Sequence, residues 1–161
     1  MTSSSSIILL WIAAISSGLI AGVYFAFSAF IMQAFGKIHS TQGISAMNAI
    51  NETILRSAFM PLFFASSIIS LWLIFSGYIH WGETGSELTL LAGAIYFTGM
   101  FACTVIFNVP LNNALAAIDD DSKNTQIIWS DYLKSWTRWN HLRTFSSLCS
   151  CIICIYILSI L

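Results

Sequence analysis

The sequence predicts an all-α integral membrane protein, a four-helix bundle with two interfacial helices on its cytoplasmic side. Three observations predict this class. Hydrophobic residues make up 57% of the 161 residues and charged residues 8%, whereas a soluble domain carries about 25% charged residues. Four apolar stretches each reach the roughly 20 residues that cross a hydrocarbon core. The basic residues are confined to two of the three connections between these stretches.

This composition excludes a soluble enzyme and a nucleic-acid-binding protein. A surface with so few charges could not be kept in water. Six Lys and Arg residues against seven Asp and Glu residues leave no basic patch for phosphates. A length of 161 residues suits one domain, so we treat residues 1–161 as a single four-span membrane domain whose surroundings are the lipid bilayer.

The four predicted spans cover about residues 7–34, 54–79, 88–109 and 141–161, and none has a charged residue in its middle. We interpret the first as a retained span, because no basic segment precedes it and it is longer than the apolar core of a signal peptide. Within it, Gly18, Gly22 and Ala26 recur every four residues. Small residues at this spacing let a second helix approach closely.

The distribution of the basic residues predicts the orientation. All six lie in the two connections that share one face of the membrane: Lys37, Arg56, Lys123, Lys134, Arg138 and Arg143. Cytoplasmic loops carry an excess of Lys and Arg, so we expect that face to be cytoplasmic and both termini to lie outside. We expect the membrane to be the inner, cytoplasmic membrane of a bacterium.

A first interfacial helix is predicted over about residues 41–55. Apolar residues recur there at helical spacing, and the polar stripe beside them consists of Asn48, Asn51 and Glu52. Glu52 and Arg56 have the spacing of a helix ion pair. Two interpretations stay open: a solvated polar face with a surface ion pair, or a face that contributes Asn48, Asn51 and Glu52 to a substrate-binding site.

The end of the third span carries the segment Asn108-Val109-Pro110-Leu111-Asn112-Asn113. Pro110 lacks an N–H and disfavours helical dihedrals at the residue before it, so we expect the helix to break near Asn108. The carboxamides of Asn108 and Asn112 either satisfy the backbone groups that the break frees or face a ligand. Both roles remain open at this stage.

The second interfacial helix is predicted over residues 129–143. One stripe of this helix is rich in indoles, with Trp129, Trp136 and Trp139. Indoles are common at membrane interfaces, yet three within eleven residues are more than an interface requires. His141 lies off the stripe, and we expect it to point into the bundle. There it is either a functional base or donor, or a buried histidine that is simply hydrogen-bonded.

These polar groups lead to one prediction about a site. We expect five side chains to converge on a cavity at the cytoplasmic end of the bundle: Asn108, Asn112, Trp136, His141 and Arg143. Each needs a hydrogen-bond partner at membrane depth, and Arg143 can reach the carbonyl oxygen of either asparagine. We predict no metal, haem or other cofactor, because no ligand spacing, haem-attachment motif or phosphate loop is present.

Four segments of the chain resemble the anthrone oxygenase-like family of small membrane proteins. They are GLIAGVYFAFSAFIMQAF, AMNAINETIL followed after five residues by PLFF, YFTGMFACTVIFNVPLNNALA, and W-x6-W-x2-WNHLRT. The resemblance covers about residues 10–160, and NVPLNN and WNHLR are its most specific parts. It implies a four-helix membrane protein and, for some fungal relatives, oxidation of a polyketide anthrone to an anthraquinone with dioxygen.

The predicted site suits such chemistry. An anthrone loses a benzylic proton to give a phenolate-like anion that can reduce dioxygen without a cofactor. The protein must then supply a flat apolar slot, a base and donors for the oxyanion. We assign the slot to Trp136 and Trp139, the base to His141, and the donors to Asn108, Asn112 and Arg143.

Other functions remain open. The same slot could bind a quinone or another lipid-like molecule without catalysis, or the chain could be a structural subunit of a membrane assembly. A homo-oligomer or a larger membrane complex also stays open. A small lipid-soluble aromatic substrate stays open as a partner besides the bilayer.

Overall fold

The computed structural model describes residues 4–118 and 124–161, and this part of the chain consists of helices joined by turns. Four helical stretches are long and apolar enough to cross a membrane: Ser5–Phe35, Phe59–Ile79, Ser86–Ala116 and Thr125–Ile160. The prediction of an all-α, four-span architecture is confirmed. Four spans follow from composition because only a helix satisfies its own backbone in lipid.

Two of the four stretches are interrupted by π-helical turns. The first consists of α1 (Ser4–Ala26), η1 (Phe27–Ile31) and α2 (Met32–Phe35). The third consists of α5 (Ser86–Tyr96), η2 (Phe97–Ala102), η3 (Thr104–Asn108) and α6 (Val109–Ala116). The other two are α4 (Phe59–Ile79) and α7 (Thr125–Ile160), and α3 (Ser40–Leu55) joins α2 to α4.

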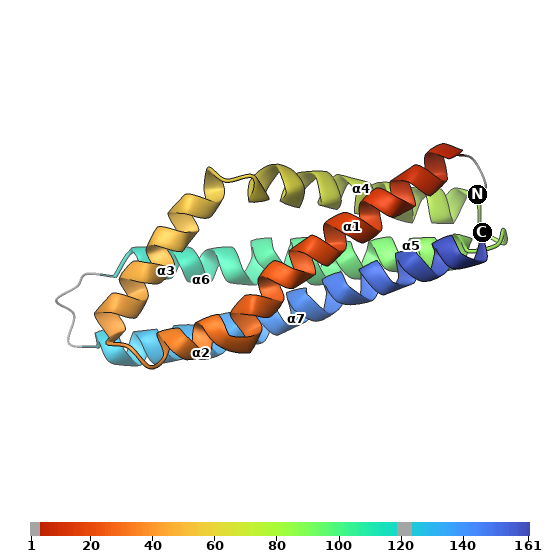
Figure 1. The fold of residues 1–161 in the computed structure, drawn as a ribbon. Helices are drawn as coiled ribbons and strands as arrows, with labels where there is room; N and C mark the ends of the chain where they lie inside the picture. The colour runs from red at the N-terminus through yellow and green to blue at the C-terminus, as the bar shows by residue number, and fades with distance from the viewer. Residues whose placement is uncertain (1–3, 119–123) are drawn as a thin grey trace.

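Figure 1 shows how these helices are arranged. α1 packs along α7, and α5 lies between α4 and α7. The start of α1, the end of α7 and the α4–α5 turn lie at one end of the molecule, and α3, the end of α6 and the start of α7 lie at the other (Figure 1). The first described helix therefore begins on the side of the bundle where the last one ends. Which side of a membrane that is stays a prediction.

The helices are close together at the end that holds the termini. We call this part the closed half: residues 4–18, 66–96 and 146–160. There α4 and α5 pack with their backbones in contact, since a Cβ on Gly77 would lie 2.5 Å from Leu90 N and one on Gly93 would lie 2.5 Å from Ser70 O. The glycine pattern of α1 matters less: Gly18 lies near Cys151 of α7, but no described atom outside the surrounding backbone lies within 4 Å of a Cβ on Gly22.

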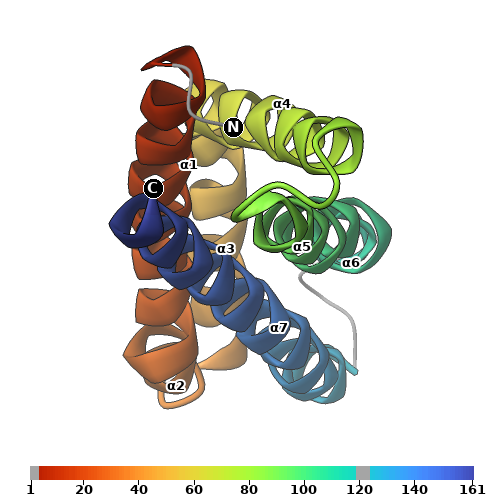
Figure 2. The same ribbon diagram turned by 90° about the vertical axis from the view of Figure 1, so that its right-hand side faces the viewer.

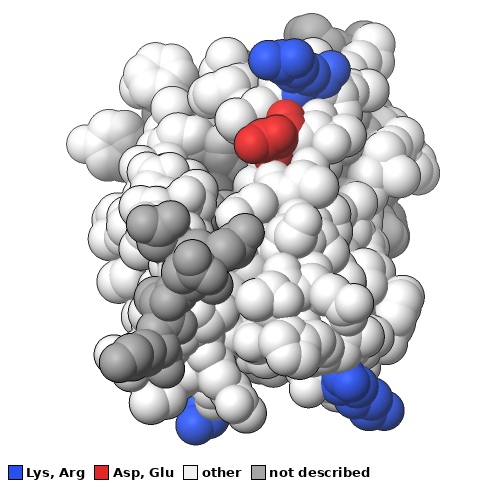
Figure 3. Space-filling view, turned by 90° about the vertical axis from the view of Figure 1, so that its left-hand side faces the viewer, with Lys and Arg blue, Asp and Glu red and all other residues white. Residues whose placement is uncertain are grey.

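The helices diverge toward the other end, which we call the wide half: residues 20–63, 97–116 and 125–143. α1 crosses the bundle obliquely, away from α4, and α3 bridges the gap between them (Figures 1 and 2). An apolar cluster holds α3 against α6 and α7. Its buried members are Met32, Ile44, Met47, Leu115, Trp129, Tyr132 and Trp136. Lys and Arg side chains lie around the rim of this end (Figure 3).

The second interfacial helix is not a separate element. Residues 129–143 form the first part of α7, which runs without a break for 36 residues and is about 54 Å long. The reason is local: no Gly or Pro occurs between Thr125 and Ile160, so nothing interrupts the helix. The first interfacial helix, in contrast, is a separate element, α3, as predicted.

The predicted break at Asn108 is also corrected. Val109 has φ −63° and ψ −47°, ordinary helical values, although Pro110 follows it. Pro110 falls in the first turn of α6, where a missing N–H costs least. The π-helical turns of η2 and η3 come directly before it. The chain therefore changes its hydrogen-bond pattern at this point instead of ending the helix.

Candidate functional site

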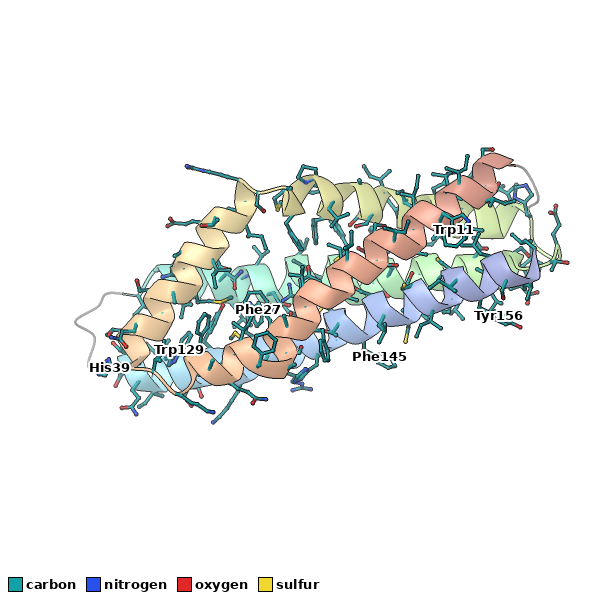
Figure 4. The ribbon with its side chains drawn as sticks, in the orientation of Figure 1. Trp11, Phe27, His39, Trp129, Phe145 and Tyr156 are labelled. Carbon is teal, nitrogen blue, oxygen red and sulfur yellow. The ribbon has the colours of Figure 1, made fainter. Side chains whose placement is uncertain are left out.

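A cavity of about 330 Å³ lies in the wide half, between α1, α3, α4, the η2–α6 segment and α7. Its volume is within the range of small-molecule sites. Most of its wall is apolar and aromatic, with Phe27, Phe59, Phe63 and Phe101 among the lining residues. Figure 4 shows the side chain of Phe27 in the wide half, whereas Phe145 and Tyr156 point outward from α7.

The cavity reaches the molecular surface between α4 and the η3–α6 segment. Phe64 on α4 is 52% exposed, Val105 on η3 is 49% exposed and Val109 on α6 is 41% exposed, and all three line the cavity. This opening is apolar on both sides. A lipid-soluble molecule can therefore enter from the bilayer without crossing a polar surface.

Each π-helical segment contributes to the cavity wall. Phe27 begins η1, Phe101 belongs to η2, and Thr104 begins η3. A π-helical turn shifts the direction of the side chains that follow it, and such turns are frequent at functional sites. No sequence motif predicts these π-helical turns, because each turn depends on how the neighbouring helices pack.

Arg143 is the buried cation of the site. The residue is 4% exposed and lines the cavity. Its guanidinium carbon lies 4.2 Å from the ring centroid of Tyr24 and 4.9 Å from that of Trp136. Aromatic faces attract a cation in this position. The guanidinium thus has its charge stabilised by rings, and no Asp or Glu is among the described residues that line the cavity.

Hydrogen bonds hold the guanidinium at one side. Nη2 of Arg143 donates to Oδ1 of Asn140 at 2.7 Å, and Nη1 donates to Oγ1 of Thr104 at 3.4 Å. Asn140 is itself fixed, because its Nδ2 donates to the carbonyl oxygen of Tyr24 and to Oγ of Ser28, both at 2.7 Å. Nε of Arg143 is buried and has no hydrogen-bond partner in the described part of the chain.

Asn112 is the second polar centre of the cavity. Its Oδ1 accepts hydrogen bonds from the hydroxyl of Tyr132 and from Nε1 of Trp136, both at 2.9 Å. Its Nδ2 donates to Oδ1 of Asn51 at 3.1 Å. Nδ2 of Asn51 is buried without a partner among residues 4–118 and 124–161. These contacts join α3, α6 and α7 at the cavity wall.

The structure brings four of the predicted site residues to the cavity wall: Asn51, Asn112, Trp136 and Arg143. Asn108 is adjacent but has another task. It is 1% exposed, its Nδ2 donates to the carbonyl oxygen of Trp136 at 3.3 Å, and its Oδ1 faces Sγ of Cys103 at 4.0 Å. Asn108 therefore ties η3 to α7 from outside the cavity lining.

The expectation that His141 points into the bundle is wrong. His141 is exposed because the inward face of α7 is taken by its neighbours Asn140 and Arg143, and the next residue along a helix is turned by about 100°. The expected hydrogen bond from Arg143 to Asn108 or Asn112 does not form either. Arg143 donates to Asn140 and Thr104 instead.

Three further predicted residues do not line the cavity. The ring of Trp139 stacks on Phe107, with centroids 3.7 Å apart and planes 6° apart. Glu52 is exposed on α3. Asn48 is half-buried, and its Oδ1 has no partner in the part of the chain that the structure describes. Within the same part, no three His, Cys, Asp or Glu side chains gather as metal ligands would.

Two residues of the site are absent from the predicted set, Tyr24 and Asn140. Tyr24 lies in the middle of an apolar span, where nothing in the sequence distinguishes it. The sequence places Asn140 on the indole-rich stripe of residues 129–143, four residues after Trp136 and three before Arg143, but it does not indicate the partners of Asn140. Those partners lie 116 and 112 residues earlier in the chain, in α1 and η1.

The fold and the cavity define a helical membrane protein with four spans and a ligand-sized apolar cavity that contains one buried guanidinium. Residues 52–153 match the family model described as Anthrone oxygenase, and the chain belongs to this family. The match includes Asn112, Trp136 and Arg143, whereas Tyr24 and Phe27 lie before it. No curated protein and no solved structure matches the chain.

Proposed function

We propose that this chain oxidises a lipid-soluble, anthrone-like aromatic compound with dioxygen and without a cofactor. One observation carries the proposal: a buried guanidinium lies at the wall of an aromatic cavity whose opening is apolar on both sides. Membership of the anthrone oxygenase family supports the same substrate class. The wide half is then the cytoplasmic end, as the positive-inside rule predicts.

The first step is the loss of a proton from the substrate. An anthrone has one carbonyl group and, opposite it in the central ring, a CH2 group. Removal of one CH2 proton gives an anion whose charge rests mainly on the carbonyl oxygen. Arg143 stabilises this oxyanion by a charge-assisted hydrogen bond in a site of low dielectric. The bound substrate thus becomes a stronger acid than it is in water.

No His, Asp or Glu lines the cavity in the described part of the chain. We therefore assign the proton to water instead of to a side-chain base. This differs from the mechanism that the sequence suggested, in which His141 was the base. Catalysis then rests on holding the anion rather than on proton abstraction by a positioned group.

Dioxygen completes the reaction. The anion passes one electron to dioxygen, and the resulting radical and superoxide combine at the former CH2 carbon. Uptake of a proton gives a hydroperoxide, and loss of water from it leaves a second carbonyl group. In sum, one anthrone and one dioxygen give one anthraquinone and one water. Both reactants partition into lipid, which suits the opening between α4 and the η3–α6 segment.

The test is oxygen uptake by the purified chain with anthrone, together with anthraquinone absorbance. We expect Arg143→Met to lower the rate by about 100-fold or more, while folding is kept because an apolar side chain can replace a buried charge. Arg138→Met, at an exposed position of the same helix, is the matched control and should retain the rate. If wild-type protein does not exceed the spontaneous rate, the oxygenase proposal is wrong. A protein that binds anthraquinone without oxidising anthrone would be a quinone-binding protein instead.

A further inference from the structure

The charge of Arg143 has no counter-ion in the part of the chain that the structure describes. Arg143 is the only charged residue among the described residues that line the cavity. Its hydrogen-bond acceptors are the amide oxygen of Asn140 and the hydroxyl of Thr104, which are both neutral. A guanidinium stays protonated at physiological pH. The cavity wall therefore carries a positive charge that no described carboxylate compensates.

The titratable groups around this cation are neutral as well. They are the phenols of Tyr24 on α1 and Tyr132 on α7, and the thiol of Cys103 between η2 and η3. Phenols and thiols are uncharged at neutral pH. The one acid of α3, Glu52, is exposed and does not line the cavity, and α4 contains no charged residue. None of the helices around the cavity thus offers Arg143 an opposite charge.

Aromatic rings offset only part of the cost of burying this charge. The guanidinium carbon lies over the rings of Tyr24 and Trp136, but a ring face attracts a cation less strongly than an anion does. A buried charge without an opposite charge is costly. Because Arg143 and both ring residues line the cavity, the field of the cation reaches a bound ligand whichever N–H groups point toward it.

We propose that the cavity binds its ligand as an anion, so that the ligand itself is the counter-ion of Arg143. The ligand class is then a flat aromatic weak acid, which passes the apolar opening in its neutral form and loses its proton to water beside the guanidinium. The site therefore selects by charge as well as by shape.

This inference rests on the proposed function for the aromatic body of the ligand but not for its oxidation. It adds one consequence to the proposed reaction. A quinone product carries no charge, so it lacks the attraction that holds the substrate anion. The product should therefore bind less tightly than the ionised substrate and leave the site.

The experiment uses 2-hydroxyanthraquinone, which cannot undergo the proposed oxidation. Its hydroxyl ionises, and the anion absorbs at longer wavelength than the neutral form. The pKa of this hydroxyl is measured by visible absorbance with the full chain in nanodiscs of zwitterionic lipid, and again in nanodiscs without protein. We expect the chain to lower the pKa of the bound compound by about one unit or more, which corresponds to a preference of about tenfold or more for the anion. 2-Methoxyanthraquinone, which cannot ionise, should bind with an affinity that does not depend on pH.

Two pairs of variants separate charge from shape. Arg143→Met removes the cation and should abolish the lowered pKa, whereas Arg138→Met, at an exposed position of the same helix, should keep it. Thr104→Asp places a carboxylate at a position whose hydroxyl lies 3.4 Å from Nη1 of Arg143, and it should also abolish the lowered pKa. Thr104→Asn has the same shape without the charge, so the two Thr104 variants should differ by about one unit. If Arg143→Met does not fold, the Thr104 pair carries the test.

The outcomes decide this inference apart from the proposed function. An unchanged or raised pKa of the compound with the wild type overturns the inference, as does a lowered pKa that persists in Arg143→Met or Thr104→Asp. Failure of the ionised compound to bind overturns it too. A lowered pKa without anthrone oxidation would refute the oxygenase proposal and leave the anion inference standing, and anthrone oxidation without a lowered pKa would do the reverse.

Discussion

The two halves of the molecule use polar side chains in different ways. In the closed half, several Ser and Thr hydroxyls bond to carbonyls three or four residues earlier in the chain, as Ser17 does to Ala13 at 2.6 Å and Thr89 does to Gly85 at 2.8 Å. Such bonds are local and need no neighbour, although the hydroxyl of Tyr96 on α5 donates to Oγ of Ser66 on α4. In the wide half, asparagines bond across helices, as Asn112 does to Asn51 and Asn140 does to Ser28.

This difference separates packing from ligand binding. Local hydroxyl bonds let small residues face one another, so that α4 and α5 approach at Gly77 and Gly93. Amides and a guanidinium link the helices of the wide half, and three donors there have no partner among the described residues: Nδ2 of Asn51, Nε1 of Trp129 and Nε of Arg143. The closed half should therefore determine stability, and the wide half should determine which molecule binds.

The largest effect on stability should come from the closed half. Gly93→Leu places a side chain where a Cβ alone would lie 2.5 Å from the carbonyl oxygen of Ser70, and we expect a loss of about 3 kcal/mol or more in the free energy of unfolding. Gly22→Leu, which meets open space in the described structure, should change it by about 0.5 kcal/mol or less. Denaturant unfolding in detergent measures both. Equal losses would mean that the two halves do not differ in packing.

A smaller effect on stability is expected at the amide centre of the wide half. Asn112→Leu leaves the indole of Trp136 and the hydroxyl of Tyr132 without their acceptor, which should cost about 1–3 kcal/mol. Denaturant unfolding in detergent measures this loss. An unchanged free energy of unfolding would show that Asn112 does not hold these helices together.

The smallest effect should come from His141. Because this side chain is exposed on α7, His141→Gln should leave anthrone oxidation within about twofold of the wild-type rate, in the range of surface substitutions. The measurement is oxygen uptake under the conditions used for Arg143→Met. A loss as large as that of Arg143→Met would place His141 in the site and contradict the geometry described above.

Much of the fold could be predicted from residue types alone. Long apolar stretches give spans because lipid offers no hydrogen bonds to an open backbone. The helical spacing of apolar and polar residues over residues 41–55 predicted α3. The absence of Gly and Pro between Thr125 and Ile160 also indicates that α7 is one continuous helix. The indole-rich polar segment instead favoured a separate interfacial helix, because such segments are typical of a membrane interface.

The site was predicted only in part. Asn112, Trp136 and Arg143 could be predicted as site residues because amides, indoles and guanidinium groups near a span need hydrogen-bond partners. The residues that serve as these partners could not be predicted. Tyr24 and Asn140 meet across 116 residues, and nothing in either segment refers to the other.

Sequence by itself determined that this chain has four spans and a group of polar residues near one end of them, because burial in lipid depends on each residue's own chemistry. Only tertiary structure decided that Arg143 faces the cavity while His141 faces outward. Helical periodicity sets the angle between two side chains, but which of them points inward depends on where the neighbouring helices lie. The same is true of the unpaired donors of the wide half, since a hydrogen-bonding group is unpaired only in relation to everything packed around it.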